Sequence, residues 1–486
     1  MSDALQSHFY VTIRNKEKTI VGHIVSPNPP PCDAHDEGVS TPKDSASEET
    51  VLSTPSVNFA SVAHTFASVM ESYRRFITLT LNIGPQLSSL MASARITKFV
   101  KEKGSEILEL STDTRTVYRL PITCYHEFHV HQEEITALVK GAEHLPEIAV
   151  IGLVSSYDAF LTELLRVVLT TYPNLVLTSE KTLKFSELCS FASIEDARAT
   201  LIDREIESVI RLSHHEQFEW MERRFAMTLR TELPVWPRFV ELCERRNLMT
   251  HTGGAVSAQY LANCGAHGAD TTGVAIGDRL SVSSQYFSEA VTIIYELGVK
   301  LCHVLWRKFA PAQREEADRV LSELCYNLIY GGAYRLAEVL LRFGTSGLKV
   351  HSSDRIRRVM VVNLANSLRL QEKQDEAKEV LDEEDWSAVD NEFSVCVAAV
   401  RGDIAEVVRL MPIIGTGSAP NAEAYRAWPV FRGMGSDERF TMAFEKVFGE
   451  PYVKPRVEPA TVAIGAPDEA ADEDGEESGS SQKLPH

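Results

Sequence analysis

The chain has 486 residues, 44% of them hydrophobic, which is the size and composition of a globular protein with two or three domains. Its formal charge of -19 opposes overall binding to nucleic acid or anionic membranes, so any nucleic-acid contact must come from a local basic patch. The eight cysteines show no CxxC spacing, which argues against a zinc site and favours reduced thiols over a disulfide framework.

Two features bear on where the protein works. Residues 1–9 lack the basic and then apolar pattern of a secretion signal. The most apolar run, Ile148 to Leu169, is interrupted by Asp158, Glu163 and Arg166, which predicts a core helix rather than a membrane span. We therefore expect a cytoplasmic protein that makes no membrane contact.

The chain before His131 divides into three predicted segments. Residues 1–25 contain two β-rich runs and are expected to form a short N-terminal strand pair. Residues 26–56 are rich in Pro, Ser, Asp and Glu, which is typical of a disordered linker. Residues 57–130 have helical spacing to about residue 105, and then a β-rich run around Pro121 that predicts a small strand pair.

Residues 131–310 have an almost wholly helical pattern. The predicted helices cover roughly 131–144, 146–171, 184–190, 193–212, 213–230, 236–251 and 283–308. Ser193, followed by Asp196, has the pattern of a helix N-cap with an acidic residue at the third position. Residues 252–282 are glycine-rich and polar, and we expect them to form a long loop, which is often functional.

Residues 311–448 are expected to form shorter helices in pairs. Similar apolar motifs begin at Ala337, Ala377 and Ala405, with unequal spacings, and a turn precedes each of them. Their mean spacing of about 34 residues is near the tetratricopeptide period, which predicts degenerate α-solenoid repeats that resemble tetratricopeptide repeats. Residues 449–486 are first Pro-rich and then acidic, and are predicted to be a disordered tail.

One predicted helix carries polar residues that packing alone does not explain. It begins near Trp236 and Pro237 and ends at a Gly253-Gly254 pair, which are favourable helix boundaries. Arg246 falls in the middle of an apolar stripe, where a guanidinium is costly unless it is paired or functional. Asn247 and His251 lie four residues apart and share one edge of that stripe. The stripe consists of Phe239, Leu242, Cys243 and Met249.

The Arg246-Asn247-x-x-x-His251 spacing matches the RNxxxH signature of HEPN domains, and the chain from 131 to 310 resembles that all-α family. The upstream helix carries Ser155 and Asp158 where the family often keeps a polar or acidic residue. The segment from Trp236 to Tyr260 is similar to bacterial HEPN proteins of phage defence and abortive infection. The resemblance implies an HEPN-like helical bundle over residues 131–310. Together with the separate likeness of residues 311–448 to α-solenoid repeats, it predicts a mainly α fold.

The resemblance also implies RNA cleavage without a metal or other cofactor, in a homodimer where Arg and His of two subunits meet in one cleft. The residues suit this chemistry, because His251 can move a proton near neutral pH and Arg246 can stabilise charge on the phosphate. Asn247 can hold the phosphate or fix the imidazole tautomer. We expect RNA, with tRNA as one candidate, to lie along a groove of Arg223, Arg224 and Arg245.

Other interpretations remain open. Arg246 can form a purely structural ion pair with Asp158, and His251 can be a helix-end histidine favoured by the helix dipole. The domain would then be a catalytically inactive scaffold or adaptor whose repeats bind a peptide or protein partner. A further alternative is the substrate half of a nucleotidyltransferase pair, modified at a tyrosine such as Tyr260. His214 and His215 point about 100° apart on a helix, so we expect no metal site there.

Overall fold

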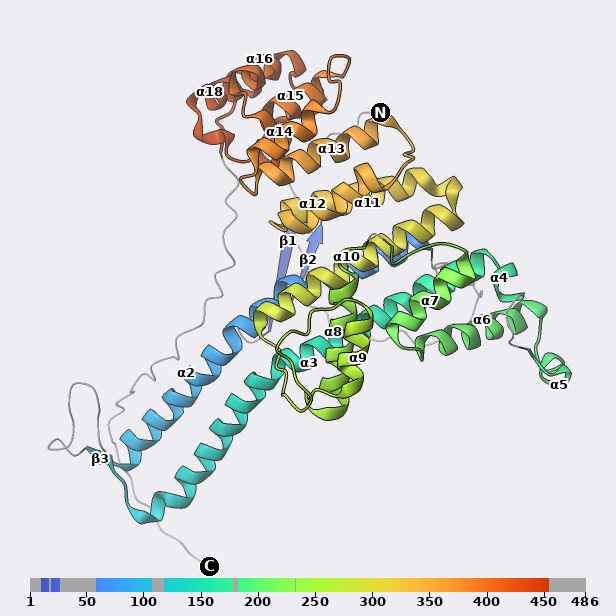
Figure 1. The fold of residues 1–486 in the computed structure, drawn as a ribbon. Helices are drawn as coiled ribbons and strands as arrows, with labels where there is room; N and C mark the ends of the chain where they lie inside the picture. The colour runs from blue at the N-terminus through green and yellow to red at the C-terminus, as the bar shows by residue number, and fades with distance from the viewer. Residues whose placement is uncertain are drawn as a thin grey trace, which may run out of the picture. The chain divides into compact units, whose positions relative to one another are not determined.

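The computed structural model of the chain describes residues 10–16, 19–26, 58–106, 118–177, 182–231 and 233–453. It contains two compact units, residues 1–56 and 57–486. The fold is mainly α-helical, which confirms the predicted class (Figure 1). The predicted linker after Ser26 and the predicted tail from residue 454 onward lie outside the described residues.

The first unit contains one antiparallel strand pair. β1 (Tyr10–Lys16) pairs with β2 (Thr19–Ser26), with Val11 opposite Val25 and a register shift between Arg14 and Asn15. The predicted N-terminal strand pair is therefore confirmed.

The second unit begins with a nearly continuous helical stretch. Asn58 caps α1 (Phe59–Ser72), since its Oδ1 accepts from the backbone N–H of Ser61 at 2.9 Å. A π-helical turn, η1 (Tyr73–Ile77), leads into α2 (Thr78–Lys103). A two-residue strand pair, β3 (Ser105–Glu106) with β4 (Tyr118–Arg119), and the 3-10 turn η3 (Ile122–Cys124) follow.

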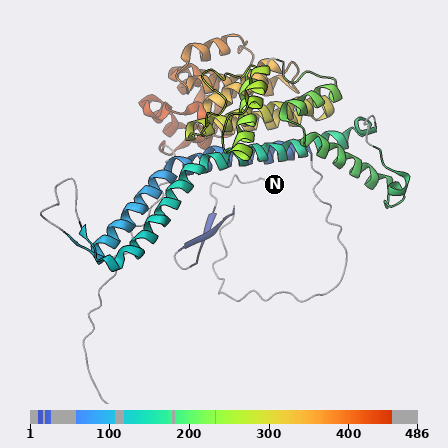
Figure 2. The ribbon, with the colours of Figure 1, turned by 60° about the horizontal axis from the view of Figure 1, so that its bottom comes forward.

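The longest helix is α3 (Tyr125–Thr171). Its first half runs antiparallel to α2, and the two form a helical hairpin that extends from the other helices of the unit (Figures 1 and 2). The predicted helices 131–144 and 146–171 are thus one helix that contains Pro146, and the boundary predicted after residue 130 lies inside it. A proline costs a helix one hydrogen bond but does not have to end it.

The second half of α3 is the centre of a helical bundle. α10 (Ser284–Phe309), α6 (Ile194–Ile210), α8 (Trp236–Thr252) and α1 all contact it. The predicted cap of α6 is present, with Ser193 Oγ accepting from the Asp196 N–H at 3.0 Å. The remaining helices of this bundle are α4 (Asn174–Leu177), α5 (Phe185–Leu188), α7 (His214–Phe225) and α9 (Ala258–Ala266).

By length and composition, one helical stretch in the described part of the chain, Ile122–Thr171, could cross a membrane. Half of its most apolar window is buried inside the protein. Leu153, Leu161 and Leu164 are fully buried there in the core of the bundle. The second half of α3 thus packs as a core helix.

After α10 the chain forms successive helix pairs (Figure 1). Each helix contacts the next, and α13 also contacts both α11 and α15. The pairs are α11 (Arg314–Tyr330) with α12 (Tyr334–Arg342), α13 (Asp354–Arg369) with α14 (Gln374–Asp382), and α15 (Asn391–Arg401) with α16 (Ile404–Ile414). η4 (Pro311–Gln313) and the π turn η5 (Phe343–Gly347) flank the first pair. α17 (Ala422–Ala427), η6 (Pro429–Phe431), η7 (Met434–Ser436) and α18 (Glu438–Phe448) complete the chain.

The turn inside each pair is the same. Gly332, Glu372 and Gly402 occupy the left-handed region, at φ of +80°, +65° and +75°. In each turn the next residue donates its N–H to the carbonyl of Leu328, Leu368 or Ala398, at 2.8, 3.0 and 2.9 Å. The first two turns are farther apart in sequence than the last two, so the repeat is irregular in length but constant in local geometry.

The predicted motifs lie on the second helix of each pair, as expected. Ala337 and Ala377 are buried five residues after the turn, but Ala405 is exposed and Val407 is buried in the equivalent place. The sequence alignment of the third motif is therefore wrong by two residues. The ordered chain also continues beyond the predicted boundary at residue 448, because Tyr452 packs against the rings of Phe440 and Phe444 at 5.3 Å.

Candidate functional site

The glycine pair predicted to end the RNxxxH helix does end α8. Gly253 has a φ of +58° and Gly254 one of +84°, and the Gly254 N–H donates to the Leu248 carbonyl at 3.1 Å. A Cβ on Gly254 would lie 2.7 Å from the Leu280 carbonyl oxygen, so only glycine fits at this position. Leu280 in turn donates its N–H to the Gly254 carbonyl at 3.0 Å. This turn fixes the end of the helix that carries the candidate site.

Arg246 lies on the predicted apolar stripe and is paired there. Its side chain is 20% exposed, and its Nη2 lies 3.4 Å from Asp158 Oδ2 on α3. The contact confirms that Asp158 is the carboxylate partner. The Nε of Arg246 is buried and has no hydrogen-bond partner within the described residues. Asp158 therefore holds the guanidinium through Nη2, and the Nε–H donor of Arg246 has no partner among the described residues.

Asp158 also has a second partner, His214 on α7. Nε2 of His214 lies 3.0 Å from Asp158 Oδ1, and the imidazole is 8% exposed. One carboxylate therefore joins α7 and α8 to α3. Sequence reasoning missed this role of His214, although the helical pattern around the residue contained a signal for it. His214 precedes Phe218, Met221 and Phe225 on one helical face, so it is a polar residue on an apolar stripe, as Arg246 is.

The other predicted site residues do not join this cluster. His251 is exposed and Asn247 is half-buried on α8, and neither makes a side-chain hydrogen bond within the described part of the chain. Ser155 is exposed and its hydroxyl donates to the Ile151 carbonyl of its own helix at 2.9 Å. The structure therefore brings together Arg246 and Asp158, and leaves His251 and Asn247 accessible to a ligand.

The neighbouring thiol and phenol remain neutral. Burial is the main cause that raises the pKa of Cys243 well above its ordinary value, and the same holds for Tyr157. Both side chains lie in the core of the bundle, and the Tyr157 hydroxyl has no hydrogen-bond partner among the described residues. Neither group provides a nucleophile at neutral pH.

Arg245, predicted to bind RNA, lies in a polar cluster inside the protein. Its Nε donates to Glu241 Oε1 at 2.7 Å, its Nη1 donates to the Ser281 carbonyl at 2.9 Å, and its guanidinium lies 4.3 Å from the Tyr286 ring centre. Tyr286 also donates its hydroxyl to Glu241, at 2.8 Å. The cluster holds α10 and the preceding loop to α8, so Arg245 has a structural role.

Tyr260 belongs to the same cluster. Its hydroxyl donates to Glu241 Oε1 at 2.8 Å, and burial, followed by the Glu241 charge, raises the pKa of the phenol. The residue is buried on α9, within the stretch 252–282 that was predicted to be a loop. That prediction is wrong in part, because Ser257 caps a helix there by accepting from the Tyr260 N–H at 3.1 Å.

The other two predicted RNA-binding arginines lie at the end of α7. Arg223 is exposed, whereas Arg224 donates from Nη2 to the Leu175 carbonyl. Within the described residues, no group of three or more His, Cys, Asp and Glu side chains is placed to hold a metal ion. Arg223 is thus the member of the predicted groove that is directed to solvent.

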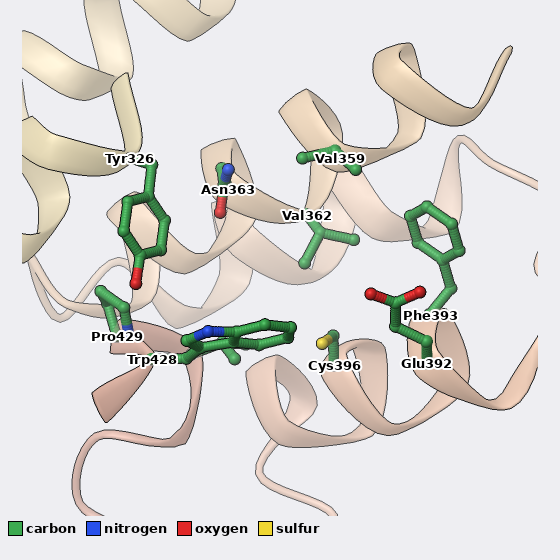
Figure 3. A pocket seen from close by; sticks show the side chains of 10 residues that line it. Tyr326, Val359, Val362, Asn363, Glu392, Phe393, Cys396, Trp428 and Pro429 are labelled. Carbon is green, nitrogen blue, oxygen red and sulfur yellow. The ribbon is translucent and has the colours of Figure 1, made fainter. Parts of the chain in front are cut away.

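A separate pocket lies among the helix pairs (Figure 3). Its volume is about 190 Å³, and the Trp428 indole forms one wall facing Val362 and Asn363. Glu392 lines the pocket and forms an ion pair with Arg355, which also pairs with Asp390. The lining residues are Tyr326, Val359, Val362, Asn363, Glu392, Phe393, Cys396, Trp428, Pro429 and Val430. The pocket is mostly apolar with a few polar groups, as small binding sites usually are.

No protein-family model matches the chain, and comparisons with curated proteins and with solved structures found no significant match either.

Proposed function

We propose that the chain is an HEPN-type endoribonuclease that acts as a homodimer without a metal, in phage defence or a stress response. The observation that carries the proposal is the state of the RNxxxH residues on α8. Arg246 is held by Asp158 and its side chain is 20% exposed, while His251 and Asn247 are unengaged at the same helix end within the described residues. Such a triplet arises by chance in roughly two of every hundred chains of this length, and its position at a helix end before Gly253 and Gly254 is the context that supports the proposal.

The proposed reaction is attack of an RNA 2′-OH on the adjacent phosphate. The bond from the 2′-oxygen to phosphorus forms and the bond from phosphorus to the 5′-oxygen breaks. One His251 accepts the 2′-hydroxyl proton, and the His251 of the second subunit donates a proton to the leaving 5′-oxygen. Arg246 stabilises the charge on the phosphate oxygens, and Asn247 donates a hydrogen bond to the same phosphate. The products are a 2′,3′-cyclic phosphate and a 5′-OH.

Asp158 and His214 have a positioning role in this proposal. The ion pair holds Nη2 of Arg246, and in the proposal the other terminal nitrogen of the planar guanidinium meets the phosphate. His214 holds the other carboxylate oxygen and thereby limits the orientations open to Asp158. A site supported in this way loses little rotamer freedom when RNA binds.

The RNA contact surface in the proposal is small. Arg223 and Arg246 are its cationic members, since Arg245 and Arg224 already donate to groups within the protein. A homodimer doubles the number of such cations in one cleft. Because only these few cations contact phosphates, we expect affinity for RNA to fall modestly as salt increases. The charge of -19 on the whole chain itself repels RNA, and salt screens that repulsion.

The second candidate function is that of a non-enzymatic adaptor. The apolar pocket among the helix pairs favours it, because Trp428 and Val362 would accept one apolar side chain of a bound peptide (Figure 3). In this interpretation the pairs are tetratricopeptide-like repeats that hold a protein partner. The same pocket also suits the first proposal, in which the repeats recruit the partner that triggers cleavage.

The test is cleavage of total RNA and of tRNA by the purified protein in the presence of EDTA. We expect cleavage by the wild type and by His64→Ala, a matched control at an exposed histidine of α1, and a loss of at least about 100-fold in His251→Ala. Arg246→Lys keeps the charge but loses the planar fork, so its rate should fall as well. Cleavage by His251→Ala at the wild-type rate would contradict the assignment, and an absence of cleavage by every protein would favour the adaptor.

A further inference from the structure

The hairpin of α2 and the first half of α3 buries very little of its own surface. Leu81 and Phe99 are the only buried residues of α2 among those whose side chains the structure describes. The buried residues of α3 begin at Val150, beyond the hairpin. Where the two helices meet, Gly84 and Gly141 line an open apolar groove, so small residues separate the larger side chains. Among the described side chains, the contact of the buried Phe99 with Phe128, at 5.9 Å between ring centres, is a small local cluster rather than an extended core.

Large apolar side chains are instead exposed along both helices, and two of them, Met91 and Leu138, line the groove between the helices. On α2 and the preceding turn they recur at spacings of three or four residues, as they do along one face of a helix. Phe76 is 67% exposed and Leu90 is 64% exposed. The exposed set comprises Phe76, Leu79, Ile83, Leu87, Leu90 and Met91 on that side, and Tyr125, Val130, Leu138, Val139 and Ile148 on α3. A helix with apolar residues on several sides is normally buried, and a patch of this extent marks an interaction surface.

The charges of the two helices are opposite. The sequence from Phe76 to Ala94 contains no charged residue. Beyond it, the end of α2 carries Arg95, Lys98, Lys101 and Lys103 against Glu102, a net charge of +3. The first half of α3, residues 125–148, carries Glu127, Glu133, Glu134, Glu143 and Glu147 against Lys140, a net charge of -4. The hairpin therefore presents a basic helix beside an acidic one.

Some charged side chains of the hairpin form ion pairs between α2 and α3, and others do not. Arg95 Nη1 lies 3.0 Å from Glu134 Oε2, and Lys103 Nζ lies 3.8 Å from Glu127 Oε2. Lys98 is well exposed and has only Glu102 of its own helix nearby, at 3.9 Å, and Glu143 has no ion pair within the described residues. A two-fold axis would place the basic α2 of one hairpin against the acidic α3 of another, because such an interface is self-complementary.

From these observations we infer that the α2–α3 hairpin is a dimerisation surface, on which the same hairpin of a second copy packs to form an antiparallel four-helix bundle. The apolar side chains of both hairpins would form the core of that bundle, and opposite charges would line its edges. The 26 residues of α2 give the bundle a length of about 39 Å. The inference does not depend on the ribonuclease proposal, because it uses no residue of α8.

The first test is the mass of the full chain in solution, measured by light scattering over a range of concentrations. We expect the wild type to have twice the chain mass of 54.1 kDa. The double variant Ile83→Glu/Leu90→Glu places charges seven residues apart on the exposed face and should be a monomer with unchanged helical content. Met442→Glu is the matched control, because Met442 is equally exposed at 64% but lies on α18, and it should remain a dimer.

The second test uses charge. Lys98→Glu/Lys101→Glu and Glu133→Lys/Glu143→Lys should each weaken self-association, and an equimolar mixture of the two variants should recover dimers that contain one chain of each. Recovery of these mixed dimers requires contact between α2 of one copy and α3 of the other. Variants that had lost their fold would not form mixed dimers.

Three outcomes would overturn the inference. A monomeric wild type at every concentration would show that the hairpin does not bind a second copy. A dimer in Ile83→Glu/Leu90→Glu would place the interface elsewhere and leave dimeric ribonuclease action intact. Binding of the monomer to vesicles of phosphatidylcholine and phosphatidylserine, lost in that same variant, would show that the apolar face meets a membrane. If His251→Ala loses RNA cleavage but remains a dimer, the result concerns the proposed catalytic site and not the hairpin interface.

Discussion

Asp158 is the residue on which the candidate site depends structurally. It accepts from Arg246 and from His214, which belong to two different helices. Removing it leaves a partly buried guanidinium whose Nε is already without a hydrogen bond. We therefore expect Asp158→Ala to lower the free energy of unfolding by about 1–3 kcal/mol, measured as a shift of the urea midpoint.

Asp203 provides the control for that measurement. It pairs with Arg166, and both side chains are more than one third exposed. Such a surface pair is worth less than about 1 kcal/mol, so Asp203→Ala should change the midpoint little. Equal midpoints for the two variants would contradict the role assigned to Asp158.

A second residue makes the stability of the protein depend on pH. His303 is fully buried on α10, and burial, followed by the Arg307 charge, lowers its pKa from 6.5 to about 3. In the unfolded chain the imidazole binds a proton as the pH falls below 6.5, whereas in the folded chain it stays neutral. Stability should therefore be lost as the pH falls from about 6.5 toward 3, by roughly 1.4 kcal/mol per pH unit.

His303→Gln isolates this effect. Glutamine offers Arg307 an acceptor in place of the imidazole Nδ1, which lies 3.1 Å from Arg307 Nη1. The free energy of unfolding, measured between pH 5 and pH 7, should depend less on pH in the variant than in the wild type. The same slope in both proteins would show that His303 does not titrate on unfolding.

At the scale of the elements, the turn inside the middle helix pair differs from the others in one respect. Glu372 adopts a φ of +65°, where the equivalent residues are Gly332 and Gly402. Left-handed backbone is costly for a residue with a Cβ, so Glu372→Gly should raise the free energy of unfolding by about 0.5–1 kcal/mol. The expected gain is measurable as a higher urea midpoint.

The reverse substitution, from glycine to a residue with a Cβ, can be made at Gly402 in the third helix pair. A Cβ on Gly402 would meet no atom within 4 Å, so Gly402→Ala tests the backbone cost alone. We expect a loss of about 1 kcal/mol. Glu372→Ala serves as a control that keeps the Cβ, and it should leave the stability nearly unchanged. A gain in Glu372→Ala as large as in Glu372→Gly would rule out backbone strain as the cause.

The sequence predicted the class of the elements well and some of their boundaries poorly. Helix N-caps and C-terminal glycines depend mainly on residues that are near in sequence. The cap at Ser193 and the helix end at Gly253 were therefore predicted correctly. The continuity of α3 through Pro146 and the presence of α9 depend on tertiary packing, because Tyr260 and Cys264 bury one face of α9. The third repeat was misaligned because the letters at 405–409 match the motif, whereas burial follows the turn at Gly402.

The candidate site, too, could be predicted only in part from the sequence. The Arg246–Asp158 pair was predictable, because a cation on an apolar stripe requires a carboxylate from a neighbouring helix. The contribution of His214 was not, since it requires α7 to pack beside α3 across 56 residues of sequence. Arg245 looked available for RNA, but Glu241 and Tyr286 already engage it within the protein.

At the scale of the whole second unit, the bundle and the helix pairs are joined by packing rather than by a linker. Asp318 of α11 is fully buried, where it is paired with Arg307 of α10 and accepts from the Ser352 N–H at 2.7 Å. The division predicted between residues 310 and 311 therefore lies within one continuous core. A partner bound at the helix pairs would contact the same rigid unit that carries α8.

If His251 acts on RNA as we propose, the chemistry of the RNA ends will show it. RNA would be sequenced from cells that express the wild type or His251→Ala, with selective capture of 2′,3′-cyclic phosphate ends. We predict new cyclic phosphate ends, each matched by a 5′-OH end at the next nucleotide, in the wild type and not in His251→Ala. The same new ends in both samples, or ends that carry a 3′-OH and a 5′-phosphate, would contradict the account.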